Sequence, residues 1–204
     1  MGKIFYLMGK SASGKDTLFK EILGRIPELK TVVPYTTRPI RTGEKNGREY
    51  FFTTGKELQR LLDAGKVIEC RTYHTMMGDW HYFTVDDGQI NLIKENYLII
   101  GTLESYEKTR QYFGKEQLIP LYITVENGLR LQRALDREKI QSEPRYDEMC
   151  RRYLADEKDF CKERLKSCDI EKSYENADFQ VCLNTIVEEI RGITINNLSK
   201  RENL

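Results

Sequence analysis

The sequence predicts an α/β fold with a mostly parallel sheet. Three short apolar runs indicate strands that are buried on both faces, because they lack the polar alternation of a strand with one wet face. These runs are KIFYLMG at residues 3–9, YLIIGT at 97–102 and LIPLYITV at 118–125. Helical patterns separate and follow them, and strands that alternate with helices are typical of parallel sheets.

Size and composition favour one domain that spans residues 1–204. A chain of 204 residues is long enough for one sizeable core, and its 39% of apolar residues distinguish it from disordered chains. Lysine and arginine together number 33, and aspartate and glutamate 32. No net basic field therefore attracts nucleic acid or an anionic membrane, and any anion site must be local.

Nothing in the sequence directs the chain out of the cytoplasm. Its apolar runs are far shorter than the roughly 20 residues of a membrane-spanning helix, and the N-terminus lacks the apolar core of a secretion signal. The five cysteines form no Cys-x-x-Cys pair and only two histidines are present, which argues against a zinc site. We expect a cytoplasmic protein with reduced thiols.

A glycine-rich loop, GKSASGKDT at residues 9–17, joins the first strand to a segment with helical spacing that ends at Pro27. Gly9, four further residues, Gly14 and Lys15 match the spacing of a phosphate-binding loop in its proper context, after a strand and before a helix. In such loops backbone N–H groups face phosphate oxygens and the lysine adds a mobile charge. The predicted triphosphate ligands are Gly9, Ser11, Ala12, Ser13, Gly14, Lys15, Asp16 and Thr17.

Asp16 occupies the position where a serine or threonine hydroxyl usually meets the metal. Two roles fit a carboxylate there. It can bind Mg²⁺ directly or through water, because this hard cation accepts carboxylate oxygens and offsets their repulsion from phosphate. Alternatively, it complements the dipole of the first helical turn, and Thr17 or water meets the metal. Both roles stay open at the level of the sequence.

Two segments interrupt the alternation of strands and helices. Residues 35–85 contain short strand patterns around a helix at KELQRLLDAG, and predict a small, mainly antiparallel insertion. Residues 126–165 are charged and helical, with a break at QSEPRY where Pro144 is placed to start a second helix. The core then comprises residues 1–34, 86–125 and 166–204, and closes with a strand at DFQVCL and a helix at TIVEEIRGITI.

The stretch PYTTRPIRTGEKNGREYFF, residues 34–52, contains two arginines three residues apart, then a glycine turn and a tyrosine. Arg38, Arg41 and Tyr50 suit a phosphate monoester, because arginine binds phosphate bidentately and tyrosine adds a hydrogen bond. The stretch closely resembles the nucleoside-monophosphate-binding segment of guanylate kinases. The phosphate loop upstream, and RALDR with a long helix downstream, extend the resemblance over most of the chain.

This resemblance implies a three-layer P-loop kinase core, a nucleotide-binding insertion at 35–85 and a helical lid at 126–165. It implies phosphoryl transfer from ATP to GMP, with Mg²⁺ as the cofactor and the two nucleotides as partners. Glu69 matches the acid that accepts hydrogen bonds from the guanine ring, and a carboxylate suits the two donors on that edge. The residues implied for catalysis are Lys15, Arg38, Arg133 and Arg137, and Asn184 is implied near the donor base.

The sequence departs from the family pattern at the acceptor site. Pro34 replaces a serine and cannot donate a side-chain hydrogen bond. Gly101 and Leu103 stand where the family has carboxylates after a strand. Recognition of the base is therefore expected to depend more heavily on Glu69.

A second departure lies in the insertion. The family's Tyr-Gly-Thr corner aligns with His81, Tyr82 and Phe83, which makes His81 and Tyr82 the candidate acceptor ligands there. Packing is the alternative role for His81 and for the neighbouring Trp80.

Three functions compete at this stage. The first is phosphorylation of GMP by ATP. The second is kinase chemistry on another phosphorylated acceptor such as a phosphosugar, because related P-loop kinases of phosphosugars also carry Lys-Asp in the loop. The third is a catalytically weak binding module of the guanylate kinase-like type. The intact Gly14-Lys15 loop and the complete arginine pair argue against the third.

Overall fold

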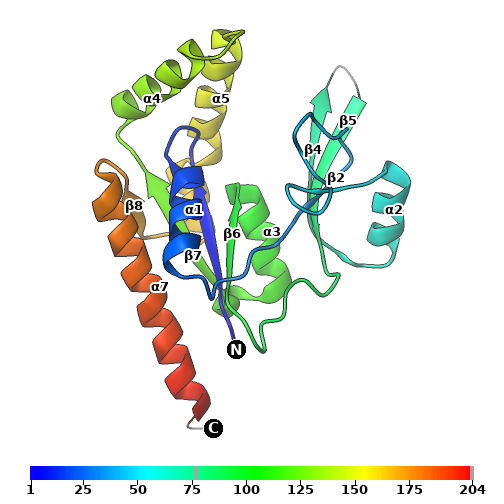
Figure 1. Cartoon of the computed structure of the whole chain (residues 1–204), viewed down its shortest axis with the longest axis vertical. Coiled ribbons are helices and arrows are strands. Elements are labelled where there is room, and N and C mark those ends of the chain that lie inside the picture. Colours follow the sequence, from blue (N-terminus) through cyan, green and yellow to red (C-terminus); the bar gives the residue numbers. More distant parts are fainter. Residues whose placement is uncertain (76–77, 203–204) are drawn as a thin grey trace.

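The computed structural model describes residues 1–75 and 78–202, with side chains through residue 197, and contains two sheets (Figure 1). The main sheet has the strand order β6-β1-β7-β8 and all its pairings are parallel. Its strands are β1 (Ile4–Gly9), β6 (Tyr97–Gly101), β7 (Leu118–Thr124) and β8 (Ser173–Glu175). The predicted α/β fold is confirmed, and β1, β6 and β7 are the strands expected from the apolar runs.

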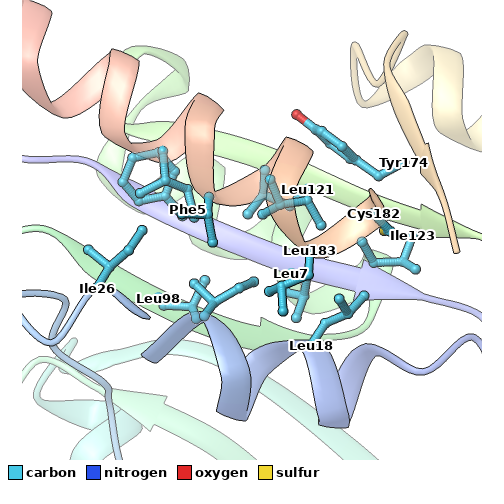
Figure 2. Close-up of a cluster of buried hydrophobic side chains, with 14 of the residues drawn as sticks. Phe5, Leu7, Leu18, Ile26, Leu98, Leu121, Ile123, Tyr174, Cys182 and Leu183 are labelled. Carbon is cyan, nitrogen blue, oxygen red and sulfur yellow. The ribbon is translucent and has the colours of Figure 1, made fainter. Parts of the chain in front are cut away.

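Helices on both faces of the main sheet give three layers. These helices are α1 (Lys15–Arg25), α3 (Leu103–Phe113), α6 (Lys162–Ser167) and α7 (Phe179–Glu202), with the short 3-10 helix η1 (Lys115–Gln117) before β7. Phe5 and Leu7 of β1 pack with α1 and α7, and Figure 2 shows side chains from these elements meeting in one cluster. Tyr6 and Met8 enter the other core, beside α3. Because β1 is covered on both faces, the loop that follows it is fixed at the carboxyl edge of the sheet, where α/β folds bind ligands.

The second sheet forms the insertion, with the order β3-β2-β5-β4. Its elements are β2 (Tyr35–Thr36), β3 (Phe51–Phe52), α2 (Gly55–Asp63), β4 (Val67–Thr75) and β5 (Gly78–Val85). β5 pairs antiparallel with β2 and with β4, and only β2 and β3 run parallel, so the mainly antiparallel prediction is confirmed. Leu58 and Leu61 of α2 pack against Phe83 and Val85 of β5.

The charged segment forms two helices, α4 (Asn127–Lys139) and α5 (Tyr146–Asp159), which lie above the core in Figure 1. α5 begins two residues after Pro144. The prediction that Pro144 starts this helix is therefore wrong. The turn before α5 is instead fixed by Glu138, whose Oε1 accepts a hydrogen bond from the backbone N–H of Arg145 at 2.6 Å.

The terminal strand predicted at residues 178–183 is wrong, because this segment belongs to the start of α7. Phe179, Val181 and Leu183 recur at every second position, which is the spacing typical of a strand. Asp178 caps the helix instead: its Oδ1 accepts from the N–H of Val181 at 3.0 Å, and its carbonyl accepts from Cys182. The last strand is β8, five residues earlier.

No helix in the described ranges is both long and apolar enough to cross a membrane. All five cysteines lie within these ranges and form no disulfide there. Burial raises the pKa of the Cys182 thiol to about 11.

Candidate functional site

The phosphate loop, residues 9–17, adopts a backbone that its glycines make possible. Ala12 and Gly14 have φ angles of 62° and 83°, in the left-handed region, an arrangement that lets neighbouring N–H groups converge on an anion. A side chain on Gly9 would meet the carbonyl oxygen of Ile123 at 2.6 Å. The loop is therefore closely packed against β7, and α1 begins directly after it at Lys15.

Asn176, which the sequence did not single out, supports the loop. It follows β8, is 2% exposed, and donates from Nδ2 to the carbonyl oxygen of Ser13 at 2.8 Å. Arg133 donates from Nη1 to the backbone carbonyl of Asn176 at 3.0 Å, so this predicted lid arginine lies beside the loop. Asn184 lies on the exposed side of α7 and bonds to Arg25. The misplaced terminal strand explains why Asn184 was singled out, since the asparagine that follows the actual strand is Asn176.

Two carboxylates of α5 contact the phosphate loop. Asp156 Oδ2 accepts the backbone N–H of Ser11 at 2.7 Å, and Glu157 Oε2 lies 2.7 Å from Lys10 Nζ. Arg130 of α4, which is 1% exposed, bonds to Glu157 and lies 3.5 Å from Asp156. No sequence pattern predicts this cluster, because the charged residues of a helix follow the same pattern whether they face water or a neighbouring loop.

The two arginines of the acceptor stretch differ in their surroundings. Arg38 is 4% exposed and forms a bidentate pair with Glu44, at 2.8 Å from Nη1 and 2.6 Å from Nη2. Its guanidinium also lies 5.1 Å from the centre of the Tyr50 ring. Hydrogen bonds from Arg38 and from the backbone of Arg41 lower the pKa of Glu44 to about 2. The side chain of Arg41 is exposed, free of the constraint that holds Arg38.

Two adjoining cavities lie next to these residues. The first, about 340 Å³, is bounded by Tyr6 and Ile99 of the core and by Glu69 of the insertion. The second, about 500 Å³, lies between the insertion and α5. Tyr50 and Arg71 line both cavities. The second cavity brings together Arg41, Tyr50, Arg71, Tyr73, Tyr82, Arg151 and Arg152.

His81 and Tyr82, the two candidate acceptor ligands of the Tyr-Gly-Thr corner, lie on opposite faces of β5. Tyr82 and Trp80 line the second cavity, and the Tyr82 ring meets that of Tyr50 edge to face with centres 5.6 Å apart. His81 points to the opposite face, as strand alternation requires, and its Nδ1 lies 2.9 Å from Thr72 Oγ1. The structure thus brings Tyr82 to the acceptor side, and it does not bring His81 there.

Glu69 lies in the wall of the first cavity and is 4% exposed. Thr84 Oγ1 donates to its Oε1 at 2.8 Å, and Arg71 Nε donates to its Oε2 at 3.1 Å. The arginine compensates a carboxylate that would otherwise be costly to bury. Arg71 was not predicted as a site residue, because one arginine in a strand pattern reads as solvent-exposed.

Tyr6 explains the missing carboxylate at position 101. A Cβ atom on Gly101 would lie 2.2 Å from the Tyr6 hydroxyl oxygen, which is hydrogen-bonded to Ser105 Oγ at 2.6 Å. Burial, and then the charge of Glu69, raise the pKa of Tyr6. Leu103, the first residue of α3, is 1% exposed and packs in the core. Aromatic and aliphatic groups therefore occupy the space in which the family places acids.

Arg137, the second predicted lid arginine, is exposed on α4. It borders a narrow gap that is also lined by Ser11 of the phosphate loop and Arg152 of α5. Both predicted lid arginines, Arg133 and Arg137, thus lie near the phosphate loop on α4.

A sequence comparison identifies the family. The profile described as Guanylate kinase matches residues 1–190. The chain belongs to the guanylate kinase family. A curated guanylate kinase from Nostoc sp. is 34% identical over 103 residues, 50% of each chain, and one from Geobacter sulfurreducens is 40% identical over 73 residues, 36% of each. These alignments thus span half or less of the length of the guanylate kinases concerned.

A solved structure shows a similar fold. The crystal structure of a guanylate kinase from Anaplasma phagocytophilum matches with a TM-score of 0.59 at 21% sequence identity, over 94% of this chain and 85% of that chain. The resemblance to guanylate kinases that the sequence motifs indicated is confirmed.

Proposed function

We propose that the protein transfers the γ-phosphoryl group of ATP to GMP, forming ADP and GDP. The observation that carries this proposal is the pairing of an intact phosphate loop with a separate cavity whose wall contains the buried carboxylate of Glu69. Such a carboxylate suits the N1–H and N2 amino donors of guanine. Both nucleotides are cytoplasmic metabolites, so we place the reaction in the cytoplasm.

The predicted residues other than His81 and Asn184 have roles in this proposal. Phosphoryl transfer needs in-line placement and charge neutralisation rather than covalent work from the protein. Lys15 and the loop N–H groups hold the donor phosphates, while Arg133 and Arg137 add positive charge from the lid. Arg41, Tyr50, Tyr82 and the Glu44-bound Arg38 hold the phosphate of GMP.

Mg²⁺ is the expected metal. Asp16 has a side chain that is 78% exposed, 3.7 Å from Lys15 Nζ, where it is accessible to a metal bound at the phosphates. Among the described residues, no group of three or more His, Cys, Asp or Glu side chains is arranged to hold a metal. One carboxylate suits Mg²⁺, which usually keeps waters and takes its other ligands from the substrate phosphates. When bound, the metal neutralises phosphate charge.

We further propose that the chain works as one domain with three parts. The core is formed by residues 1–34, 86–125 and 166–204, of which 203–204 lie outside the described residues. Residues 35–85 are the GMP-binding insertion, of which 76–77 lie outside the described residues, and 126–165 are the lid. The second cavity lies between the insertion and α5, so closure of these two parts would exclude water from the phosphates.

The test is an acceptor panel with ATP and Mg²⁺, in which ADP release is measured and the product identified by ³¹P NMR. The panel contains GMP, AMP, CMP, UMP and a pentose phosphate, and Lys15→Ala serves as the inactive control. We expect GMP to be the preferred acceptor and folded Lys15→Ala to be inactive, because the charge that follows the γ-phosphate is lost. Preference for the pentose phosphate would replace the guanylate kinase reaction with sugar-phosphate phosphorylation. Near-normal turnover by Lys15→Ala would contradict a P-loop enzyme altogether.

A further inference from the structure

Arg71 lies on the same strand face as Glu69, two residues further along β4. Side chains at positions i and i+2 of a strand point to one face, and here that face borders the first cavity. Arg71 lines the second cavity as well, so it stands where the two cavities adjoin. The guanidinium is thus placed between the buried carboxylate and the exposed arginine of the acceptor stretch, Arg41.

The hydrogen bonds of Arg71 leave most of its donors unused. Nε donates to Glu69, but Nη1 and Nη2 form no hydrogen bond with any described residue, although the side chain is only 18% exposed. Burial opposes the charge, yet the nearby carboxylate of Glu69 and the phenols of Tyr6 and Tyr73 together raise the pKa of Arg71 above its ordinary value. A charged fork with four N–H groups therefore faces the cavities and has no hydrogen-bond partner among the described residues.

The two side chains together present a pattern that matches guanine. One edge of this base carries, in order, the N2 amino group, N1–H, the O6 carbonyl and N7. A carboxylate accepts from the first two, and an arginine fork donates to the last two, which is the commonest specific contact between proteins and guanine in nucleic acids. Adenine reverses the pattern at both inner positions, because it has an amino group at C6 and an acceptor at N1.

We propose that Arg71 is a specificity-determining residue that reads O6 and N7 of the acceptor base while Glu69 reads N1 and N2. The inference rests on the proposed phosphorylation of GMP. In this role Arg71 does more than neutralise the buried charge of Glu69. It discriminates between bases at a site where Gly101 and Leu103 offer no polar side chain.

The test combines base analogues with variants of Arg71. Values of kcat/KM are measured for GMP, for 7-deaza-GMP, which lacks only the N7 acceptor, and for the 2,6-diaminopurine monophosphate, in which an amino group replaces O6 and N1 becomes an acceptor. We expect wild type to prefer GMP over the diaminopurine nucleotide by about ten- to a hundredfold. Arg71→Gln should lower kcat/KM for GMP, bring it to within about threefold of the value for 7-deaza-GMP, and reduce the preference over the diaminopurine nucleotide to the part that Glu69 supplies at N1. Arg71→Lys should retain part of it, because an ammonium donates to O6 but does not match both acceptors in one plane.

Arg110→Gln is the matched control. Arg110 is 17% exposed and is also paired with a carboxylate, that of Asp169, but it lies on α3 away from both cavities. The preference for GMP should stay at the wild-type value in this variant.

Three results separate the possibilities. If Arg71→Gln lowers kcat/KM for all three nucleotides by the same factor, Arg71 only holds Glu69 in place and the inference fails while the proposed function stands. If wild type uses both analogues as well as GMP, the inference fails without reference to any variant. If wild type phosphorylates none of the three, the proposed function fails and the inference falls with it.

Discussion

The carboxylate of Asp156 accepts a hydrogen bond from the backbone N–H of Ser11 at 2.7 Å, and so joins α5 to the phosphate loop. In a phosphate loop the backbone N–H groups are the donors that meet phosphate oxygens. The α5 carboxylate occupies one of those donors. In the proposed reaction, ATP and Asp156 therefore compete for the same group, and the charge of Asp156 opposes that of the arriving phosphates.

Asp156→Asn should strengthen ATP binding. The amide oxygen still accepts from Ser11, but the negative charge is gone, so we expect the KM for ATP to fall by about two- to tenfold at low salt. The KM for GMP should change little. Steady-state kinetics at two salt concentrations would measure both effects, since screening reduces an electrostatic difference.

Asp159→Asn provides the control for the competition with Asp156, because it removes a charge from the end of the same helix at a side chain that is 60% exposed. An increase in the KM for ATP in Asp156→Asn would contradict the competition. It would indicate that Asp156 anchors the lid in the conformation that binds ATP.

Asp16 allows its two possible roles to be separated by substitution. If it binds the metal, Asp16→Asn should shift the Mg²⁺ dependence to higher concentration, Asp16→Ser should retain much of the activity by restoring a hydroxyl, and Asp16→Ala should be the least active. A role limited to the helix dipole predicts a loss of about 1 kcal/mol or less in the free energy of unfolding, with the metal titration unchanged. Glu21→Gln, an exposed acid further along α1, is the control for loss of charge. Mg²⁺ titrations that coincide in all variants would exclude the metal role.

Arg38 and Arg41 should respond differently to replacement by alanine, because one is buried and the other exposed. Arg41→Ala should raise the KM for GMP by about ten- to a hundredfold, the range of a hydrogen bond to a charged group, without a change in thermal stability. Arg38→Ala should lower the melting temperature as well, since it leaves Glu44 without its bidentate partner.

Kinetics and thermal denaturation of both arginine variants provide the measurements. Arg60→Ala is the control, because Arg60 is 69% exposed on α2 and pairs only with Glu57 of the same helix. Equal weakening of ATP and GMP in Arg41→Ala would show that this arginine does not belong to the acceptor site.

The sequence predicted those parts of the site that local spacing determines. The phosphate loop needs left-handed backbone and close approach at fixed positions, so Gly9, Gly14 and Lys15 are recognisable without a structure. Asn176 was missed because residues 178–183 carry two competing signals. Their alternation indicates a strand, Asp178 indicates a helix cap, and the period alone does not decide between the two.

Contacts between distant segments could not be predicted. The bond between Ser11 and Asp156 joins residues 145 positions apart, and nothing in the local pattern of α5 distinguishes Asp156 from the solvated acids around it. Likewise, the register of β4 and β5 decides that Tyr82 faces the second cavity and His81 does not. A shift of one residue would have exchanged their positions.

Gly101 and Tyr6 should depend on each other. A methyl group at position 101 would lie 2.2 Å from the Tyr6 hydroxyl oxygen and 2.7 Å from Ser105 Oγ, both of which are held in a buried hydrogen bond. We expect Gly101→Ala to lower the free energy of unfolding by about 1 to 3 kcal/mol, the usual cost of overpacking. In a Tyr6→Phe background the cost should be smaller by at least about 0.5 kcal/mol, because the nearest atom has been removed.

Urea denaturation of the four proteins in this cycle measures the coupling between positions 6 and 101. Gly24→Ala is the matched control: Gly24 lies in α1, a methyl group there would meet nothing within 4 Å, and alanine is the better helix former by about 0.5 to 1 kcal/mol. It should therefore stabilise the protein, opposite in sign to Gly101→Ala. If Gly101→Ala costs the same with and without the Tyr6 hydroxyl, then Tyr6 is not what prevents a side chain at position 101. The absence of the family's carboxylate there would then require a different physical cause.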